Sequence, residues 1–180
     1  YFMTEVNLSG NGGMGEIVSN GIELDACNSS VYQKPMTVSV QNANGIRKMY
    51  ILSNNLGSGR ILKRFDISSS GINLVSSTIL PANLQNLSSF EMELSVDQSK
   101  LALADKNSNS VYIIHLNVNG DIDLNQGNFL QGISKYNIAS GKVCTGIEFT
   151  HGNSKLLVGA LNTGIYLVDL ISSNFNLLQG

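Results

Sequence analysis

The chain has 180 residues, of which 42% are hydrophobic and 13% are charged, and its formal net charge is −2. This length allows a sizeable buried core, and the low charge excludes the concentrated Lys/Arg surface that nucleic-acid binding requires. No apolar run approaches the ~18 residues of a membrane-spanning helix, so the sequence also argues against membrane insertion.

A short apolar–polar–apolar phrase recurs four times, at intervals of about 50 residues. Its polar centres are Asn7, Asp66, His115 and Asp169. A self-similar unit of roughly this length, made of strand-like segments without helical periodicity, is typical of a β-propeller blade. We therefore predict an all-β fold of consecutive four-stranded antiparallel meanders.

The first unit, residues 1–30, is predicted to contain only half a blade. One strand is expected over residues 2–8 and another over 16–18, joined by a glycine-rich hairpin at 10–15. A phosphate-binding loop would need a helix directly after the glycines, and strand-like residues follow them instead.

Three complete units follow, each with the period-2 alternation and turn residues of a meander. In the unit at residues 31–80, strands are predicted at 36–40, 48–52, 61–67 and 72–74. In the unit at 85–130, they are predicted at 90–94, 100–104, 111–116 and, after the Asn119-Gly120 hairpin signal, through Ile122 and Leu124. In the unit at 140–180, they are predicted at 146–150, 155–159, 165–170 and 175–178.

This arrangement amounts to about three and a half blades, fewer than the four to eight that close a propeller. We expect a mature or excised segment of a larger, seven-bladed-like propeller. Assembly of two copies into one ring is a second option that suits a symmetric dimer. A solitary arc is least favoured, because its uncovered apolar faces would promote aggregation.

The four polar centres, Asn7, Asp66, His115 and Asp169, have two readings. They could form a ring of ligands, or each could stabilise its own blade by bonding to turn backbone. Repetition at equivalent positions favours the second reading, so we expect a structural blade position.

The sequence contains no recognisable catalytic, cofactor-binding or metal-binding constellation. Glu91 and Glu93 lie on one face of a strand, as paired glycosidase carboxylates would, but such pairs normally come from different elements. Cys27 and Cys144 are interpreted as two thiols, with a long-range disulfide as the alternative in an oxidising compartment.

Surface contacts are expected in the three loops between second and third strands, at residues 54–60, 105–110 and 160–164. The candidate contact residues are Asn54, Asn55, Arg60, Asp105, Lys106, Asn107 and Asn162.

Residues 1–18, 90–104 and 146–158 resemble WD40/YVTN-like propeller regions of large secreted or surface proteins of Bacteroidota, of the type IX secretion and gliding or adhesion kind. Such units usually read F-S-P-D-G-x-K-L, whereas here Val96 and Gln98 take the places of the Pro and the Gly. The resemblance implies a secreted or cell-surface, non-enzymatic binding or scaffold module without a cofactor.

The partner of such a module would be a protein, a glycan or the remaining blades of a longer chain. The alternative is a fragment of a propeller hydrolase, lyase or oxidoreductase whose central-channel site lies mostly in other blades.

Overall fold

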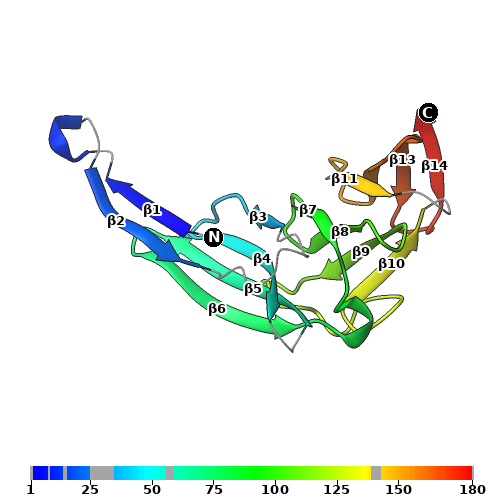
Figure 1. Cartoon of the computed structure of the whole chain (residues 1–180), viewed down its shortest axis with the longest axis horizontal. Helices are drawn as coiled ribbons and strands as arrows, with labels where there is room; N and C mark the ends of the chain where they lie inside the picture. Colours follow the sequence, from blue (N-terminus) through cyan, green and yellow to red (C-terminus); the bar gives the residue numbers. More distant parts are fainter. Residues whose placement is uncertain are drawn as a thin grey trace. The chain divides into compact units, whose positions relative to one another are not determined.

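The computed structural model describes residues 2–7, 9–13, 16–24, 35–55, 59–138 and 143–179 (Figure 1). These residues form an all-β fold of antiparallel strands with two short 3-10 turns, as the sequence predicts. The chain divides into two compact units, Tyr1–Val31 and Tyr32–Gly180.

The first unit contains a β-hairpin. Strand β1 (Phe2–Asn7) pairs antiparallel with β2 (Glu16–Glu23), and the short 3-10 turn η1 (Asn11–Gly13) lies between them. Gly12 adopts φ 67°, a left-handed conformation that glycine takes without steric cost. The glycine-rich segment therefore leads into a strand, as predicted, rather than into a helix.

The second unit contains three four-stranded antiparallel sheets, which follow one another from cyan to red in Figure 1. Sheet 1 consists of β3 (Met36–Val38), β4 (Arg47–Asn55), β5 (Gly59–Ser68) and β6 (Gly71–Ile79). Sheet 2 consists of β7 (Ser89–Leu94), β8 (Lys100–Asp105), β9 (Ser110–His115) and β10 (Ile133–Asn137). Sheet 3 consists of β11 (Cys144–Phe149), β12 (Lys155–Ala160), β13 (Gly164–Asp169) and β14 (Phe175–Gln179).

In each sheet the strands are neighbours in chain order, which confirms the predicted meanders. The short 3-10 turn η2 (Ala82–Leu84) lies between sheets 1 and 2 and buries Leu84.

One strand prediction is wrong. The fourth strand of sheet 2 does not run through Ile122 and Leu124, but is β10, so the sheet extends beyond residue 130. Ile122 forms only a single bridge, to Leu116. Residues 116–132 instead leave the sheet after β9 and return to it at β10, and we call them the excursion.

Burial explains this outcome. The Asn119-Gly120 pair does turn the chain, since the Gly120 N–H bonds to the carbonyl of Asn117 at 2.8 Å. However, Leu124 remains 60% exposed, whereas Ile133 and Tyr136 in β10 are 1% and 7% exposed. The strand that buries more apolar surface occupies the sheet edge.

Sheet 2 is buried on both faces because its strands alternate. Leu101 and Leu103 of β8 join the core shared with sheet 1, and Ala102 and Ala104 join the core shared with sheet 3. All four are fully buried, and each such leucine contributes about 1.5–3 kcal/mol relative to exposure. The three sheets thus pack face to face in chain order, which holds their connecting turns in fixed positions.

Candidate functional site

The repeated polar position lies in the third strand of each complete sheet, directly opposite a lysine in the second strand. The three cross-strand pairs are Asp66–Lys48, His115–Lys100 and Asp169–Lys155. The sequence analysis missed these lysines, although each lies at or next to the start of its strand. These lysines could have been found from the sequence, because each occupies the same place in its repeat unit.

The contacts of the repeated position differ between sheets. In sheet 3 the Asp169 carboxylate accepts the backbone N–H groups of Ile171 and Ser172, both at 2.9 Å. These two bonds, with the charge of Lys155, hold the pKa of Asp169 below its ordinary value. This is the turn-backbone contact that the sequence analysis expects.

The other positions have other surroundings. In sheet 2, Nε2 of His115 shares a 2.8 Å hydrogen bond with the hydroxyl of Ser134 in the fourth strand. Burial, and then the charge of Lys100, lower the pKa of His115, so the ring is neutral at pH 7. Oδ1 of Asp66 is buried without a hydrogen-bond partner among the described residues, and the Asn7 side chain lies outside them.

Four of the predicted contact residues lie in strands and not in loops: Asn54 and Asn55 end β4, Arg60 lies in β5 and Asp105 ends β8. Arg60 and Asp105 are also buried. Arg60 lies in β5 and is 0% exposed, so it cannot contact a partner from the surface. Asp105 is 5% exposed, and its carboxylate accepts the N–H groups of Ser88 and Asn107, both at 3.2 Å. The sequence analysis places both in loops between second and third strands, whereas the structure holds each side chain inside the protein.

The remaining predicted contact residues are distributed as follows. Asn107 and Asn162 are exposed in their turns, and Asn54 and Lys106 are half-buried. The side chain of Asn55 and residues 56–58 lie outside the described part of the chain.

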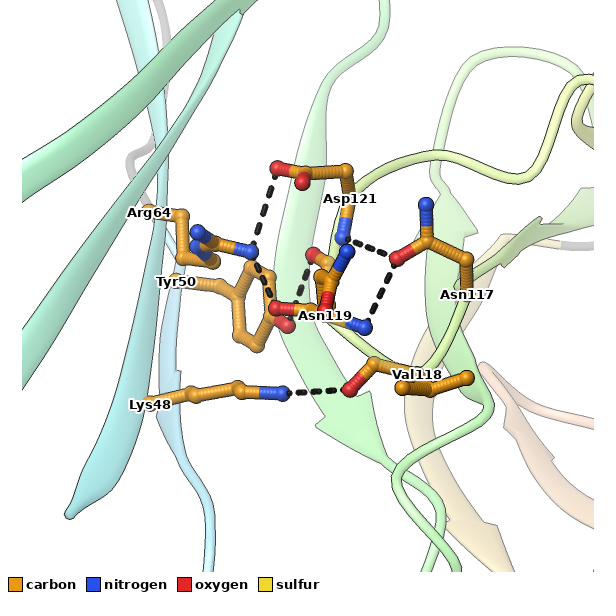
Figure 2. Close-up of polar contacts among 8 residues, drawn as sticks. Lys48, Tyr50, Arg64, Asn117, Val118, Asn119 and Asp121 are labelled. Atoms are coloured by element: carbon orange, nitrogen blue, oxygen red, sulfur yellow. Dashed lines mark hydrogen bonds and ion pairs between the residues drawn. The ribbon is translucent and has the colours of Figure 1, made fainter.

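The excursion is fastened to sheet 1 by three side chains, which Figure 2 shows. The Lys48 ammonium donates to the carbonyl of Val118 at 3.2 Å, and the Tyr50 hydroxyl donates to the carbonyl of Gly120 at 3.0 Å. We call Lys48, Tyr50 and Arg64 the latch.

Arg64 makes the third attachment. Its guanidinium forms an ion pair with the Asp121 carboxylate at 3.1 Å and donates to the carbonyl of Asn119. The Arg64 side chain is 8% exposed and that of Asp121 is 44% exposed. The positive charge of Arg64 is therefore buried, whereas the negative charge of Asp121 is partly exposed to solvent.

The turn at the tip of the excursion, residues 117–121, has a backbone conformation that leaves room for the Tyr50 hydroxyl. The Asn117 side chain accepts the N–H groups of Asn119 and Asp121 at 2.9 and 3.1 Å. Gly120 has φ 87°, and a Cβ there would lie 2.5 Å from the Tyr50 hydroxyl. Burial raises the pKa of Tyr50 to about 12, so this hydroxyl keeps the proton that it donates.

An open groove of about 600 Å³ lies beside the latch. Its lining residues are Asn42, Lys48, Asp97, Gln98, Ser99, Leu116, Asn117, Val118 and Asp123. A second hollow of about 230 Å³ shares Gln98 with the groove and lies between the first strands of sheets 1 and 2. We call this region, formed by residues 39–46 and 95–99 together with the excursion, the turn edge.

The turn edge combines exposed aliphatic side chains with fixed polar groups. Its three valines, Val40, Val96 and Val118, are 63%, 65% and 93% exposed, and Val38 at the adjoining end of β3 is 42% exposed. Burial would raise the pKa of the Asp97 carboxyl, but hydrogen bonds from Ser95 and Ser99 outweigh it and hold that pKa below its ordinary value. The edge therefore presents apolar contacts around an ionised carboxylate.

Sheet 3 is also joined to this edge. The side chain of Asn153, in the turn between β11 and β12, accepts the Val96 N–H at 3.1 Å. This hydrogen bond connects the first turn of sheet 2 to the first turn of sheet 3. It therefore fixes the backbone of Val96, which lines the second hollow.

Two carboxylates of β7, Glu91 and Glu93, have catalytic potential, and Glu93 lines the second hollow. The Glu91 carboxylate accepts the Ile147 N–H at 2.9 Å, so it joins sheet 2 to sheet 3. Burial, and then the charges of Glu148 and Glu91, raise the pKa of Glu93. Within the described ranges, no group of three or more His, Cys, Asp and Glu residues could hold a metal ion.

Cys144 is a free, buried thiol, and burial raises its pKa to about 11. Such a thiol is protonated and unreactive at neutral pH. Cys27 lies outside the described residues. No helix in the described part of the chain is long and apolar enough to cross a membrane.

No family model matches the chain, and no curated protein matches it. Several solved structures, in contrast, are similar to the chain. KlAtg21, in complex with the coiled-coil of AgAtg16, is similar with a TM-score of 0.54 and 11% identity, over 78% of this chain and 41% of that one. A protein from Lactobacillus plantarum is similar with a TM-score of 0.50 and 18% identity, over 80% and 41%.

The dihydro-heme d1 dehydrogenase NirN, in complex with DHE, is similar with a TM-score of 0.52 and 12% identity, over 97% of this chain and 34% of that one. The chain thus spans less than half the length of each of these three proteins. At such identities the likeness concerns the fold alone. The chain has a propeller-like β fold.

Proposed function

We propose that the chain is a non-enzymatic binding or scaffold module of a secreted or surface-exposed protein, and that a protein partner docks on its turn edge. The observation that carries this proposal is the latch, which fixes the excursion beside an open groove. A surface loop held by three side chains from a neighbouring sheet loses little conformational freedom on binding, which favours affinity.

The chemistry of the turn edge supports a protein as the partner. A sugar-stacking platform needs exposed aromatic rings, whereas no aromatic residue is among the described residues that line the groove. The Val118 side chain is 93% exposed at the rim of the groove. KlAtg21 has a similar fold and was solved in complex with a protein partner, the coiled-coil of AgAtg16.

The test is a binding screen of the labelled chain on a peptide array and a glycan array. Val118→Asp places a charge on the groove rim, and Asn162→Asp adds the same charge at the opposite ends of the strands, in a turn between second and third strands. We expect peptide binding that falls at least tenfold with Val118→Asp and stays unchanged with Asn162→Asp. Glycan binding alone, no binding, or sensitivity only to Asn162→Asp would contradict the proposal.

A second candidate function, a fragment of a propeller enzyme, is favoured by one observation. The raised pKa of Glu93, next to Glu91 and Glu148, is the kind of perturbation that occurs at catalytic carboxyls. Turnover of chromogenic glycosides that disappears in Glu93→Gln would establish this alternative over the binding module.

A further inference from the structure

The groove of the turn edge carries more negative than positive charge. Two carboxylates, those of Asp97 and Asp123, line it, and Lys48 is the one cation among the described residues that do so. The Lys48 ammonium is already engaged, because it donates to the carbonyl of Val118 at 3.2 Å (Figure 2). Among the described residues, neither carboxylate takes part in an ion pair. The groove therefore presents two carboxylates that lack a cationic partner within the described part of the chain.

In each of these carboxylates, only one oxygen accepts hydrogen bonds from the described residues. Oδ1 of Asp97 accepts the hydroxyls of Ser95 and Ser99 at 2.6 and 2.8 Å and the Ser99 N–H at 3.1 Å. Oδ1 of Asp123 accepts the backbone N–H and the side-chain amide of Asn125 at 3.1 and 3.2 Å. These bonds hold both side chains in place, and each carboxylate keeps its Oδ2 for a donor from a partner.

Two further cations lie near the turn edge but do not line its hollows. The Lys100 ammonium donates to the Ser99 hydroxyl at 3.3 Å, and the Arg47 guanidinium donates to the Ser39 carbonyl at 3.3 Å. Neither cation is among the described residues that line the groove or the second hollow. The second hollow adds another carboxyl group, that of Glu93, to its lining. The two hollows together therefore present more acids than cations.

We propose that the groove binds a lysine side chain of an extended protein segment, an inference that rests on the proposed docking of a protein on the turn edge. An ammonium is a point charge with three donors, and it needs only one oxygen from each acceptor. An arginine forms its strongest pair with both oxygens of one carboxylate, and here Oδ1 is occupied in both. The methylene stem of a lysine can lie against Leu116, which lines the groove. The groove therefore favours lysine over arginine.

The exposed valines of the turn edge indicate which residues flank this lysine. Val118 lines the groove and Val96 lines the second hollow, and the two hollows share Gln98. An extended segment that crosses from one hollow to the other places aliphatic side chains against both valines. Val118→Asp then sets a charge against these aliphatic neighbours of the lysine. The expected partner segment is a lysine among aliphatic residues.

The test starts from the peptides that the full chain binds on the array. Each lysine in them is replaced in turn by arginine, by norleucine, which keeps the stem without the ammonium, or by glutamate. We expect the dissociation constant to rise about five- to tenfold with norleucine and about threefold or more with arginine, and glutamate to abolish binding. Raising NaCl from about 50 to about 500 mM is expected to weaken the lysine peptides and to leave the norleucine peptides unchanged.

Variants of the chain identify the groove as the site. Asp97→Asn and Asp123→Asn keep the shape of each side chain and remove its charge, and each is expected to weaken the lysine peptides about threefold or more. Asp169→Asn is the matched control, because Asp169 is also held by two hydrogen bonds and does not line the groove. Asp97→Lys is expected to bind the glutamate peptides more tightly than the wild type does, a gain that a folding defect cannot produce.

The outcomes separate this inference from the function on which it rests. If no peptide binds, the proposed function and this inference fail together. Peptides whose binding is lost in Val118→Asp but unchanged by norleucine, or equally tight with arginine, overturn the lysine site alone. Lysine dependence that persists in Asp97→Asn and in Asp123→Asn overturns it as well.

Discussion

Removal of the latch arginine provides a direct test of how the excursion is held. Arg64→Met deletes the guanidinium while keeping an unbranched, flexible side chain that can fill the same space. The substitution removes the ion pair with Asp121 and the hydrogen bond to the Asn119 carbonyl. Both former partners can then turn to water, since Asn119 is exposed and the Asp121 side chain is 44% exposed.

The magnitude follows from these exposures. A hydrogen bond from a charged donor is worth about 1.5–3 kcal/mol. The ion pair adds only about 0.5 kcal/mol, because Asp121 is screened by solvent. Relief from burying the guanidinium offsets part of the sum, so we expect Arg64→Met to lower the free energy of unfolding by about 2 kcal/mol.

Urea unfolding measures this loss as a midpoint lowered by about 1 M at an unchanged slope. Arg47→Met is the control, because it removes an exposed arginine that makes one 3.3 Å bond to the Ser39 carbonyl, and its effect is expected within about 0.5 kcal/mol. Cleavage before Asp121 by an aspartate-specific protease is expected to accelerate in Arg64→Met only. An Arg64→Met protein as stable as the wild type, with an equally resistant excursion, would refute the reasoning.

Two further predictions concern single positions. Gly120→Ala is expected to destabilise the chain by about 2 kcal/mol or more. The reason is that φ is 87° and the new Cβ would lie 2.5 Å from the Tyr50 hydroxyl. Gly71→Ala is the control in the same urea titration: φ is 116° and the space around it is open, so it reports the backbone strain alone. Asp169→Asn is expected to flatten the acid limb of the stability profile: the folded pKa of Asp169 is lowered, so its contribution is present above the unfolded pKa of about 3.9 and is lost as pH falls through the folded pKa. Urea midpoints between about pH 6 and about pH 3 measure this, and an equally steep loss in Asp169→Asn would contradict it.

The sheets could be predicted because their strands alternate with a period of two and are bounded by turn residues. The fourth strand of sheet 2 could not. Ile122 and Leu124 follow an Asn-Gly hairpin signal and lie two positions apart on one face, whereas Ile133 and Tyr136 lie three positions apart and enter the two different cores. Only the packing against sheets 1 and 3 selects the second pair, and local sequence does not contain that information.

The candidate site was less predictable than the fold. Charged and polar residues between second and third strands suggested a contact surface there, but the structure buries Arg60 and Asp105. The latch joins Lys48 and Tyr50 to carbonyls 70 positions further along the chain. A single sequence carries no signal for a contact between a side chain and a distant backbone carbonyl, because any residue can supply the carbonyl.

Hydrogen–deuterium exchange of the chain, alone and with a peptide that it binds on the array, tests the proposed docking surface most directly. The account predicts slowed exchange in the turn edge, residues 39–46, 95–99 and 116–132. Slowed exchange in residues 105–110 and 160–164 instead, with the turn edge unchanged, would contradict it.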